Sequence, residues 1–502
     1  MPARSRGAWD GLLAAVGGYA VAFVVGLATN RPFVANAIAD RIMEATPVGI
    51  ATVLLSALGV AAKPFALAGA LALAGVLGAA AGRLLAPPSP AAAGEGRGEG
   101  AHAPSLPTLP LRILALAIAQ AAIIVLLAGS HNISAVLLPY AVWAFVSAAL
   151  VAEPASQQAD RRWFLKRSFQ AAGGLVLLST AATWTLLAKT LAGAQPGRLL
   201  FPFQAPAPRQ PEFANVDGLS PEVTPVTSFY LMSKTVEDPS VAVDSWRLRI
   251  GGLVNRSLEL TYDDLMRLPR IDQWLTLRCV SNPVGGPLIS NALWSGVTLP
   301  SLLSLAGVAP EATTLVLTAR DTYSDSFPLD RALLDTTLLA YAVNGGLLNR
   351  DHGFPARVLV PGLYGFKNVK WVEELRLVAG DFSGPWQRLG WTKTAIQTTF
   401  SRIDFLRRAA SGALAGGIAF AGDRGIRSVE VRAGDQPWRQ AQLHTPQLGP
   451  LTWVQWLFPF DASGRTTVTV RATDGTGALQ EQTERGIFPD GATGWHTVTA
   501  EL

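Results

Sequence analysis

Residues 275–286 read LTLRCVSNPVGG and hold Cys279, the single cysteine of the 502-residue chain. Apolar residues alternate up to the cysteine, and a turn rich in small residues and glycine follows it. This pattern predicts a strand that ends at the thiol, where glycine lets the backbone approach a ligand closely. The alternative is a buried cysteine that packs as a small hydrophobic residue. The adjacent cation, Arg278, favours a reactive thiolate over that alternative.

A second cluster of polar residues lies further along the chain, in DHGFPAR at 351–357 and PGLYGFKNVKW at 361–371. It combines His352, Arg357 and Lys370 with several glycines. An arginine can grip a phosphate through two hydrogen bonds, a lysine adds a point charge, and glycine allows close backbone approach. The cluster therefore indicates a site for a phosphate-bearing heterocycle, although charges of this kind also occur on solvated loops.

The sequence around these clusters has the patterns of a mixed α and β domain followed by a β domain. The alternation at 246–250 predicts a strand, and Thr261 is placed to cap a short helix over 262–268. We expect an α+β domain over 227–400 and a β-sandwich over 410–502, where short alternating runs are separated by turns. The clearest of these runs are 428–432 and 466–471.

Composition separates the chain into two parts. Overall it is 49% hydrophobic and only 15% charged, with a mean hydropathy of +0.29, whereas a soluble domain carries about a quarter charged residues. Residues 1–195 hold 13 Lys and Arg and 7 Asp and Glu, a net charge of +6, and the remaining residues hold 28 and 29, a net charge of −1. The positive charge thus lies in the apolar part, and no basic surface on the scale of a domain is available for nucleic acid.

The apolar part contains several stretches long enough for a membrane span of about 20 residues. They predict a helical membrane domain over residues 1–192, with five or six spans, because the second and third stretches form either a hairpin or one broken helix. Residues 86–110 are rich in Pro, Gly and Ala and predict a flexible loop. The stretches run over 11–28, 46–62, 64–82, 113–130, 133–152 and 168–188.

Arg161 and Arg162, followed by Phe-Leu-Lys, precede the last stretch. This run, within 160–190, resembles a twin-arginine export signal, and the alternative is an ordinary positive flank on the cytoplasmic side of a membrane helix. Both interpretations place the following domains outside the cytoplasm, on a multi-pass protein of the cell membrane. Residues 193–226 are rich in proline and predict an extended tether, while the small residues at 192–194 also fit a cleavage site.

Several spaced motifs agree with one another along the second part of the chain. They are Cys279 with Ser281-Asn282 and Gly285-Gly286, the runs 352–357 and 365–371, the run 246–252, Asn344-Gly345, Gly425-Ile426 and Gly494-Trp495-His496. In order and spacing these motifs resemble the sulfite oxidase family of molybdopterin-dependent oxidoreductases, over about three fifths of the chain. The C-terminal motifs are similar to the Ig-like dimerisation domain of that family.

Together with the spans, the resemblance implies a fold and a cofactor. The expected fold is a multi-span α-helical membrane domain, then an α+β sulfite-oxidase-like molybdopterin domain, then a C-terminal Ig-like β-sandwich. The implied cofactor is molybdenum–molybdopterin, with Cys279 as the catalytic residue and the protein's only ligand to the metal, because a soft thiolate suits a metal already bound to sulfur. The positions implied for cofactor binding are Tyr230, Leu231, Asp321, His352, Arg357, Asn368, Val369 and Lys370.

Two departures from the family bear on the substrate. Sulfite oxidases carry an arginine soon after the Phe-Tyr pair, and residues 229–234 of this chain, FYLMSK, lack it. Trp391 stands where the family has its active-site tyrosine after a Trp-Gln-Arg run. The Phe-Tyr segment is closer to the periplasmic methionine sulfoxide reductase catalytic subunit. This implies oxygen-atom transfer on a small or protein-bound sulfur substrate, as a reductase more than a true sulfite oxidase. The alternative is a catalytically degenerate membrane protein that keeps the fold for binding or assembly.

Histidine and cysteine are scarce in the apolar part. Haem in a helical bundle needs axial ligands, usually His, and before Gln195 the sequence offers only His102, in the loop, and His131, in a short turn. The single cysteine also rules out the ligand set of an iron–sulfur cluster. We therefore expect no haem or iron–sulfur cluster, a membrane anchor, and a separate electron-transfer partner. The resemblance further implies a homodimer formed through the C-terminal domain.

Overall fold

The structure, a computed structural model, describes residues 211–213, 216–235, 238–409, 412–445 and 447–502. Among these residues, no helix is long and apolar enough to cross a membrane. The predicted spans, the 86–110 loop, the twin-arginine-like segment and the small-residue site at 192–194 lie outside the described residues, so they stay predictions.

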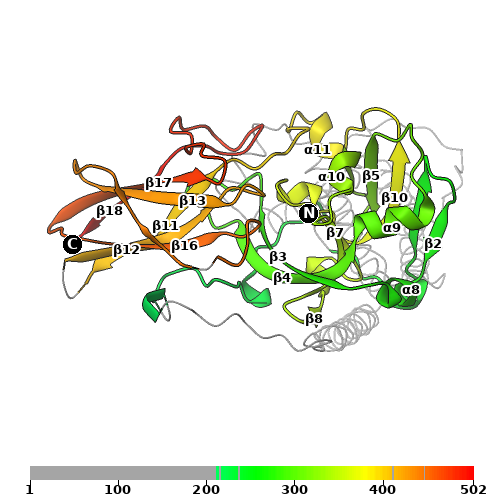
Figure 1. The fold of residues 1–502 in the computed structure, drawn as a ribbon, viewed down its shortest axis with the longest axis horizontal. Coiled ribbons are helices and arrows are strands. Elements are labelled where there is room, and N and C mark those ends of the chain that lie inside the picture. Colours follow the sequence, from blue (N-terminus) through cyan, green and yellow to red (C-terminus); the bar gives the residue numbers. More distant parts are fainter. Residues whose placement is uncertain (1–210, 214–215, 236–237, 410–411, 446) are drawn as a thin grey trace, which may run out of the picture. The chain divides into compact units, whose positions relative to one another are not determined.

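Two sheets organise the chain between residues 248 and 378, drawn in green to yellow in Figure 1. The first joins, in spatial order, β2 (Leu258–Leu260), β1 (Leu248–Gly252), β10 (Val372–Val378), β5 (Thr314–Ala319) and β6 (Ser324–Pro328). The second joins β3 (Ile271–Arg278), β4 (Ile289–Thr298), β7 (Leu338–Val343) and β8 (Gly346–Leu347), with β9 (Arg357–Leu359) paired to β7. Only β1 and β10 run parallel, and the other described pairs are antiparallel.

Short helices and 3-10 turns lie before, between and after these strands. They are α8 (Tyr262–Arg267), α9 (Leu299–Ala306), α10 (Leu329–Ala332) and α11 (Pro385–Arg388), with the 3-10 turns η4 (Pro211–Phe213), η5 (Val226–Ser228), η6 (Val243–Ser245), η7 (Arg350–His352) and η8 (Gly365–Lys367). Helix α8 begins where the sequence predicts it. The Thr261 hydroxyl accepts from Asp264 N–H (3.1 Å) and the Asp264 carboxylate accepts from Thr261 N–H (3.0 Å), so the two residues satisfy each other's end groups.

The two sheets and α9 share one apolar core. In β1 the side chains of Leu248 and Ile250 are buried and Arg249 is exposed, which confirms the alternation predicted for 246–250. Trp246 is fully buried, and its Nε1 donates to Val372 O (3.0 Å). This bond satisfies the only polar atom of the indole side chain and ties the start of β1 to β10.

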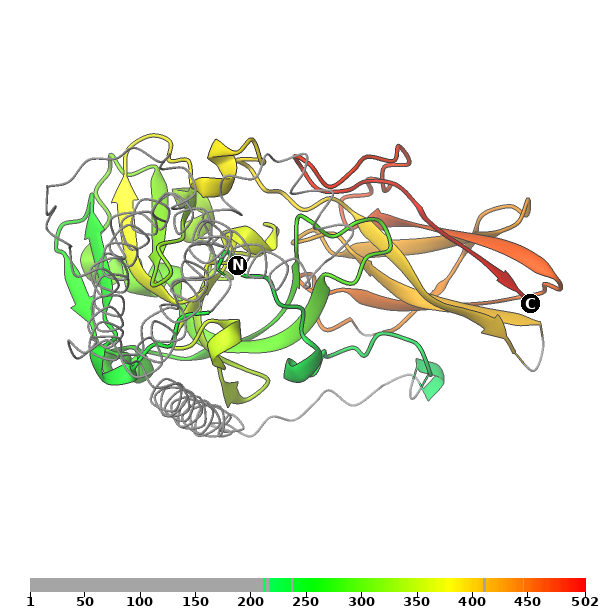
Figure 2. The same cartoon turned by 180° about the vertical axis from the view of Figure 1, so that it is seen from behind.

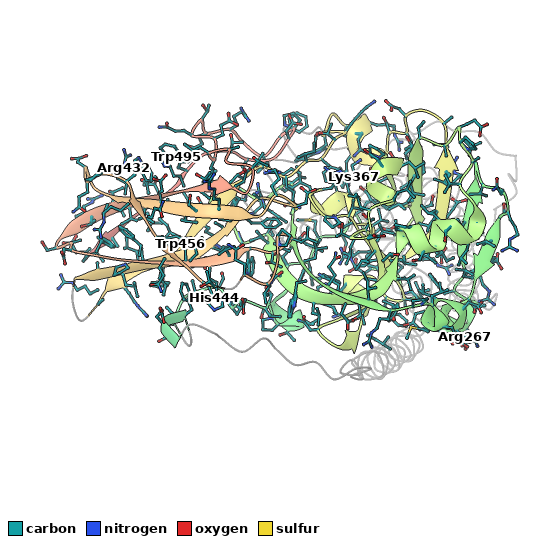
Figure 3. The ribbon with its side chains drawn as sticks, viewed as in Figure 1. Arg267, Lys367, Arg432, His444, Trp456 and Trp495 are labelled. Atoms are coloured by element: carbon teal, nitrogen blue, oxygen red, sulfur yellow. The ribbon has the colours of Figure 1, made fainter. Side chains whose placement is uncertain are left out.

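Two four-stranded sheets form the C-terminal part, drawn in orange and red in Figures 1 and 2. One joins β11 (Phe400–Arg408), β12 (Ala413–Phe420), β16 (Val454–Phe460) and β15 (Gln442–Leu443), and the other joins β14 (Arg439–Gln440), β13 (Ile426–Ala433), β17 (Arg465–Asp474) and β18 (His496–Glu501). Val429 and Val431 of one sheet share a core with Ala415 and Trp456 of the other, and Trp456 is labelled in Figure 3.

The predicted runs at 428–432 and 466–471 are therefore strands β13 and β17. The C-terminal sheets begin earlier than the predicted boundary at residue 410, because β11 pairs along its length with β12. Because β12 supplies the hydrogen-bond partners of the β11 backbone, β11 belongs to the C-terminal sheets. The Ig-like class of these sheets stays a prediction.

The end of the predicted tether also differs from the expectation. Residues 216–226 belong to the proline-rich 193–226 segment, yet Thr224 N–H donates to Asn291 O (2.8 Å) and Asn291 Nδ2 donates to Glu222 O (2.8 Å). Asn291 is fully buried in β4, so its amide needs hydrogen-bond partners, and the backbone of the segment supplies them. This end of the segment therefore belongs to the folded part.

Candidate active site around Cys279

Cys279 directly follows β3, at the neck of the β3–β4 hairpin, which confirms that the strand ends at the thiol. Its N–H donates to Leu288 O (3.0 Å), and this bond closes the loop of residues 280–287. The side chain is buried, and the backbone N–H groups of Ser281 and Val280 and the hydroxyl of Ser281 act on its sulfur as hydrogen-bond donors. Backbone N–H groups that point at one atom form a place that favours negative charge.

Burial raises the pKa of the Cys279 thiol, and the hydrogen bonds from Ser281 and the charge of Arg278 oppose this rise without cancelling it. Arg278 therefore favours the thiolate as expected, but burial outweighs its charge in the chain by itself. The guanidinium is engaged elsewhere: Nη1 donates to Thr398 O (2.8 Å), and the group lies 4.7 Å from the Phe400 ring centroid. A metal that replaces the thiol proton would supply the positive charge that stabilises the buried thiolate.

Tyr230 lies beside Cys279, against the turn η8. A β-carbon on Gly365 would come within 2.6 Å of the Tyr230 hydroxyl and 3.7 Å of Cys279 Cα, so only glycine leaves room here. Burial raises the pKa of Tyr230, and negative charge on Cys279 adds to the rise. The phenol therefore stays protonated at neutral pH and can donate a hydrogen bond. Leu231 has 41% of its surface exposed, and its contact with a cofactor stays a prediction.

Arg357 and His352 are linked to Tyr230 through Phe229. The Phe229 ring stacks on Tyr230 (5.7 Å between centroids) and meets His352 edge-on (5.3 Å). Arg357 Nη1 donates to His352 O (3.2 Å) and Nη2 donates to Asn368 O (3.1 Å). Burial lowers the pKa of His352 to about 4, and the charge of Arg357 contributes to this. The imidazole is therefore neutral at pH 7.

Asn368, Val369 and Lys370 follow η8 and differ in what they do. Asn368 Oδ1 accepts from Val360 N–H (2.7 Å), so its side chain folds its own loop. Val369 is buried in the core of the two sheets. Lys370 Nζ donates to Ser233 Oγ (2.5 Å), beside the segment that carries the Phe-Tyr pair. Their predicted contacts with a phosphate stay predictions.

The side chains around Cys279 and Arg357 fit an anionic cofactor that carries a soft metal. Arg357 is 6% exposed, its hydrogen bonds go to backbone carbonyls, and its Nε has no partner among the described residues. Burial lowers its pKa to about 10, and a buried cation without an acidic partner is costly, so a phosphate here would offset that cost. Over the described ranges, no group of three or more His, Cys, Asp or Glu could hold a metal. Cys279 would therefore bind a metal whose other ligands come from the cofactor.

Asp321 lies in the turn between β5 and β6, where its Oδ1 accepts from Tyr323 N–H (3.0 Å). Sequence reasoning missed the buried network that starts just after it. Tyr323 Oη and Lys367 Nζ both donate to the Asp325 carboxylate, each at 2.7 Å, and the side chains of Asp325 and Lys367 are only 1% and 3% exposed. Lys367, labelled in Figure 3, ends η8, so this ion pair fixes the turn that lies against the cysteine.

Trp391, which the resemblance predicts at the position of the family's tyrosine, is 8% exposed. It packs in one apolar cluster with Tyr364 and with Val280, the residue after Cys279. The ring of Phe488 meets it edge-on at 5.2 Å. The surroundings of the cysteine are therefore aromatic and apolar on this side, where a tyrosine would have offered a hydroxyl.

Comparison with known proteins identifies the family of the chain. Residues 235–386 match the family model of the oxidoreductase molybdopterin binding domain. The uncharacterized oxidoreductase YuiH of Bacillus subtilis is 35% identical over 146 residues, which cover 29% of this chain and 72% of that protein. The chain belongs to the sulfite oxidase family of molybdopterin-binding oxidoreductases. It is thus a molybdopterin-dependent oxidoreductase, as the spacing of the motifs predicts.

Two further relatives show how far the likeness of this oxidoreductase extends. The sulfite oxidase of Arabidopsis thaliana is 28% identical over 375 residues, covering 60% of this chain and 92% of that enzyme. Human mitochondrial sulfite oxidase is 31% identical over 229 residues, which cover 41% of each chain. The crystal structure of the sulfane dehydrogenase SoxCD from Paracoccus pantotrophus matches 56% of this chain and 82% of that chain with a TM-score of 0.50 and 24% identity, so it shares the fold.

Replacing Arg357 by Met is expected to weaken retention of the molybdenum cofactor at least about tenfold, because a hydrogen bond to a charged group contributes about 1.5–3 kcal/mol. The cofactor-free variant should unfold at the same urea concentration as the wild type or a higher one, because an unpaired buried cation is removed. Molybdenum per chain after dialysis and urea unfolding measure the two effects. Arg320→Met, at a half-exposed guanidinium that pairs with Glu373, is the matched control and should keep its cofactor. Full molybdenum in Arg357→Met would contradict the phosphate role.

His352 is expected to make stability depend on pH. Its pKa of about 4 in the folded chain lies below the ordinary value of 6.5, so between these values the unfolded chain binds more protons. The neutral imidazole contributes about 3 kcal/mol to the free energy of unfolding above pH 6.5. This contribution is lost as the pH falls toward 4. Urea unfolding at pH 7 and pH 4.5 should show a smaller loss for His352→Gln than for the wild type. Equal losses of stability in the variant and the wild type would show that His352 does not cause the pH dependence.

Proposed function

We propose that this oxidoreductase transfers an oxygen atom from a sulfoxide-type substrate, small or protein-bound, at a molybdenum centre held by Cys279. The bound cofactor supplies the two-electron chemistry. Reduction of a sulfoxide consumes two electrons and two protons and releases a thioether and water. The side chains described above bind the cofactor, exclude water from the cysteine and orient the substrate.

The observation that carries this proposal is that neither nearby cation is set out for an anionic substrate, because Arg278 is bound to Thr398 and Arg357 is assigned to the cofactor phosphate. The Arg278 guanidinium donates to the backbone and hydroxyl of Thr398, and Arg357 donates to backbone carbonyls. A sulfite anion needs cationic side chains on the substrate side, whereas the Phe-Tyr segment here continues with Leu231, and Trp391 presents no hydroxyl. This environment favours a neutral sulfoxide over an anion.

The Tyr230 hydroxyl is the group best placed to act on such a substrate. Its raised pKa keeps the proton on the phenol, and it lies next to Cys279. A protonated phenol can donate a hydrogen bond to a sulfoxide oxygen and so polarise the sulfur–oxygen bond. Its assigned role is therefore to orient the oxygen of the substrate and to stabilise the charge that develops on it.

Dye-coupled assays on the full-length oxidoreductase, normalised to molybdenum content, test the substrate. We expect a reduced dye to be oxidised in the presence of free or protein-bound methionine sulfoxide, and expect little dye reduction with sulfite. Tyr230→Phe should lower kcat for the sulfoxide about 10²-fold, the typical contribution of a positioned acid. Sulfite turnover that exceeds sulfoxide turnover would contradict the reductase assignment, and turnover of neither would leave it without support.

The same proposal assigns a location and partners. The catalytic domain lies outside the cytoplasm, anchored by the N-terminal spans, a separate protein delivers the electrons without haem or iron–sulfur clusters in this chain, and the C-terminal sheets pair two copies. Its support is the charge-poor, His-poor composition before residue 195 and the Arg161-Arg162 run. Light scattering of the purified chain tests the dimer.

Changing Arg161 and Arg162 together to Lys is expected to leave the catalytic domain on the cytoplasmic side, because the twin-arginine machinery reads this pair while a plain positive flank would keep its charge. Protease protection of the domain in spheroplasts measures its side. The variant with Lys166 and Arg167 exchanged for Arg and Lys is the matched control and should be exported. Unchanged export of the Arg161 and Arg162 variant would favour the ordinary membrane helix.

A further inference from the structure

The loop that follows Cys279 reaches the C-terminal sheets. A β-carbon on Gly285, whose φ is +72°, would lie 2.3 Å from His496 Nε2, so the imidazole lies directly against the loop backbone. His496 Nδ1 accepts a hydrogen bond from Ile403 N–H (3.0 Å), which fixes the ring on β11. His496, the first residue of β18, therefore braces the tip of loop 280–287.

Arg402 of β11 makes a second connection to the same loop. Its Nη1 donates to Gly286 O (2.8 Å), its Nη2 donates to Ser220 Oγ (2.7 Å), and its Nε donates to Asp404 Oδ1 (2.6 Å). Asp404 Oδ2 in turn accepts from Ser220 N–H (2.9 Å). The side chains of Arg402 and Asp404 are only 13% and 5% exposed, so water competes little for these bonds. One guanidinium thus joins the loop, the segment that leads to Tyr230, and the C-terminal sheets.

This bracing bears on the sulfur because loop 280–287 supplies several of the polar groups that act on it. These groups are the backbone N–H of Val280 and the backbone N–H and hydroxyl of Ser281, which favour negative charge on the sulfur. Inside the loop, Asn282 is fully buried and its Oδ1 accepts from Leu288 N–H (2.8 Å). Without its contacts at the tip, the loop would be held at its neck, by this side chain and by the packing of Val280 and Val284 in the apolar cluster of Trp391. Fewer contacts lower the cost of opening the loop locally.

We propose that Arg402 and His496 are positioning residues, which hold loop 280–287 so that its backbone N–H groups face Cys279 Sγ. The C-terminal sheets then complete the active site of their own chain, separately from any pairing of two copies. The inference rests on the proposed role of Cys279 as the metal ligand. It does not depend on the substrate or on the direction of the reaction.

Alkylation of the cysteine tests the proposal directly, because the chain has one cysteine and a thiol probe reports on it alone. The full-length chain is prepared without cofactor as the wild type, Arg402→Gln and His496→Ala, and its reaction with iodoacetamide is followed under native conditions at one pH. Each variant should react at least about tenfold faster than the wild type, because losing a charged hydrogen bond or a packing contact raises the population of the open loop by about this factor. After cofactor loading, both should also retain less molybdenum.

Arg424→Gln is the matched control. Arg424 Nε donates to Asp474 Oδ2 (2.8 Å), and its other nitrogens donate to Gln397 O (3.1 Å) and Thr399 Oγ1 (3.2 Å). It therefore has the same kind of pairing as Arg402, in the same part of the chain, but none of these bonds goes to the cysteine loop. Its variant should lose thermal stability and keep the alkylation rate of the wild type.

Two results would overturn the proposal: an unchanged alkylation rate in Arg402→Gln and His496→Ala, or an equal acceleration in Arg424→Gln, which would indicate general loosening. If Arg402→Gln does not fold, His496→Ala decides by the same criteria. A finding that Cys279→Ser keeps molybdenum would remove the proposed function. The alkylation rates would still decide separately whether Arg402 and His496 hold the loop.

Discussion

Replacing Cys279 by Ser is expected to lower turnover per chain at least about a thousandfold, which corresponds to about 4 kcal/mol in the activation barrier. The hydroxyl of serine is a harder ligand with a much higher pKa than a thiol, so it suits a sulfur-bound metal poorly. The backbone N–H groups of Val280 and Ser281 would still point at the side chain. They favour an anion there, and at neutral pH the serine would not provide one.

Dye-coupled turnover and molybdenum content of Cys279→Ser, measured side by side, show whether metal or chemistry is lost. Thermal unfolding of the cofactor-free variant is the control for folding, and it should match the wild type because the two side chains have nearly the same size. Ser295→Ala, a buried change in β4, controls for a general effect of substitution near the hairpin. Turnover within tenfold of the wild type would show that the oxidoreductase does not use this cysteine as its ligand.

Replacing Lys367 by Met is expected to lower the free energy of unfolding by about 3–5 kcal/mol, because it leaves the Asp325 carboxylate buried without its cation. The remaining donors to this carboxylate are Tyr323 Oη (2.7 Å), Ser326 N–H (2.7 Å) and Gln387 Nε2 (3.4 Å), which bring no positive charge. Urea unfolding of the cofactor-free chain measures the change. A loss below about 1 kcal/mol would mean that the pair contributes little to holding η8.

The double variant Asp325→Asn with Lys367→Met should recover most of this loss, because both charges are then absent. The control is Arg267→Met on α8, whose guanidinium pairs with Asp264 (3.0 Å) at the surface, with a side chain that is 73% exposed. Arg267 and Lys367 are both labelled in Figure 3. The control should change stability little, because exposed ion pairs are screened by water.

Local patterns predicted the elements on which the site is built. The alternation before Cys279 placed it at the end of a strand, and the Thr261 cap placed the start of α8, because such signals depend on residues close together in the sequence. The spacing of the motifs also led to the family and its cofactor. The structure differs from the predicted boundary at 410 and from the predicted end of the extended tether at 226, because strand pairing and the partners of buried Asn291 depend on residues far away in the sequence.

By itself, then, the sequence determined a strand-end cysteine, a cluster of phosphate-binding residue types and an ordinary charge content after an apolar first part. The tertiary structure alone decided where each charge is used. It turned Arg278 away from the thiol toward Thr398 and buried Lys367 against Asp325. It also brought Arg402 of the C-terminal sheets onto the cysteine loop. The physical reason is that a charge is compensated by whichever group lies nearest once the chain is folded, and these partners are 42 or more positions away in the sequence.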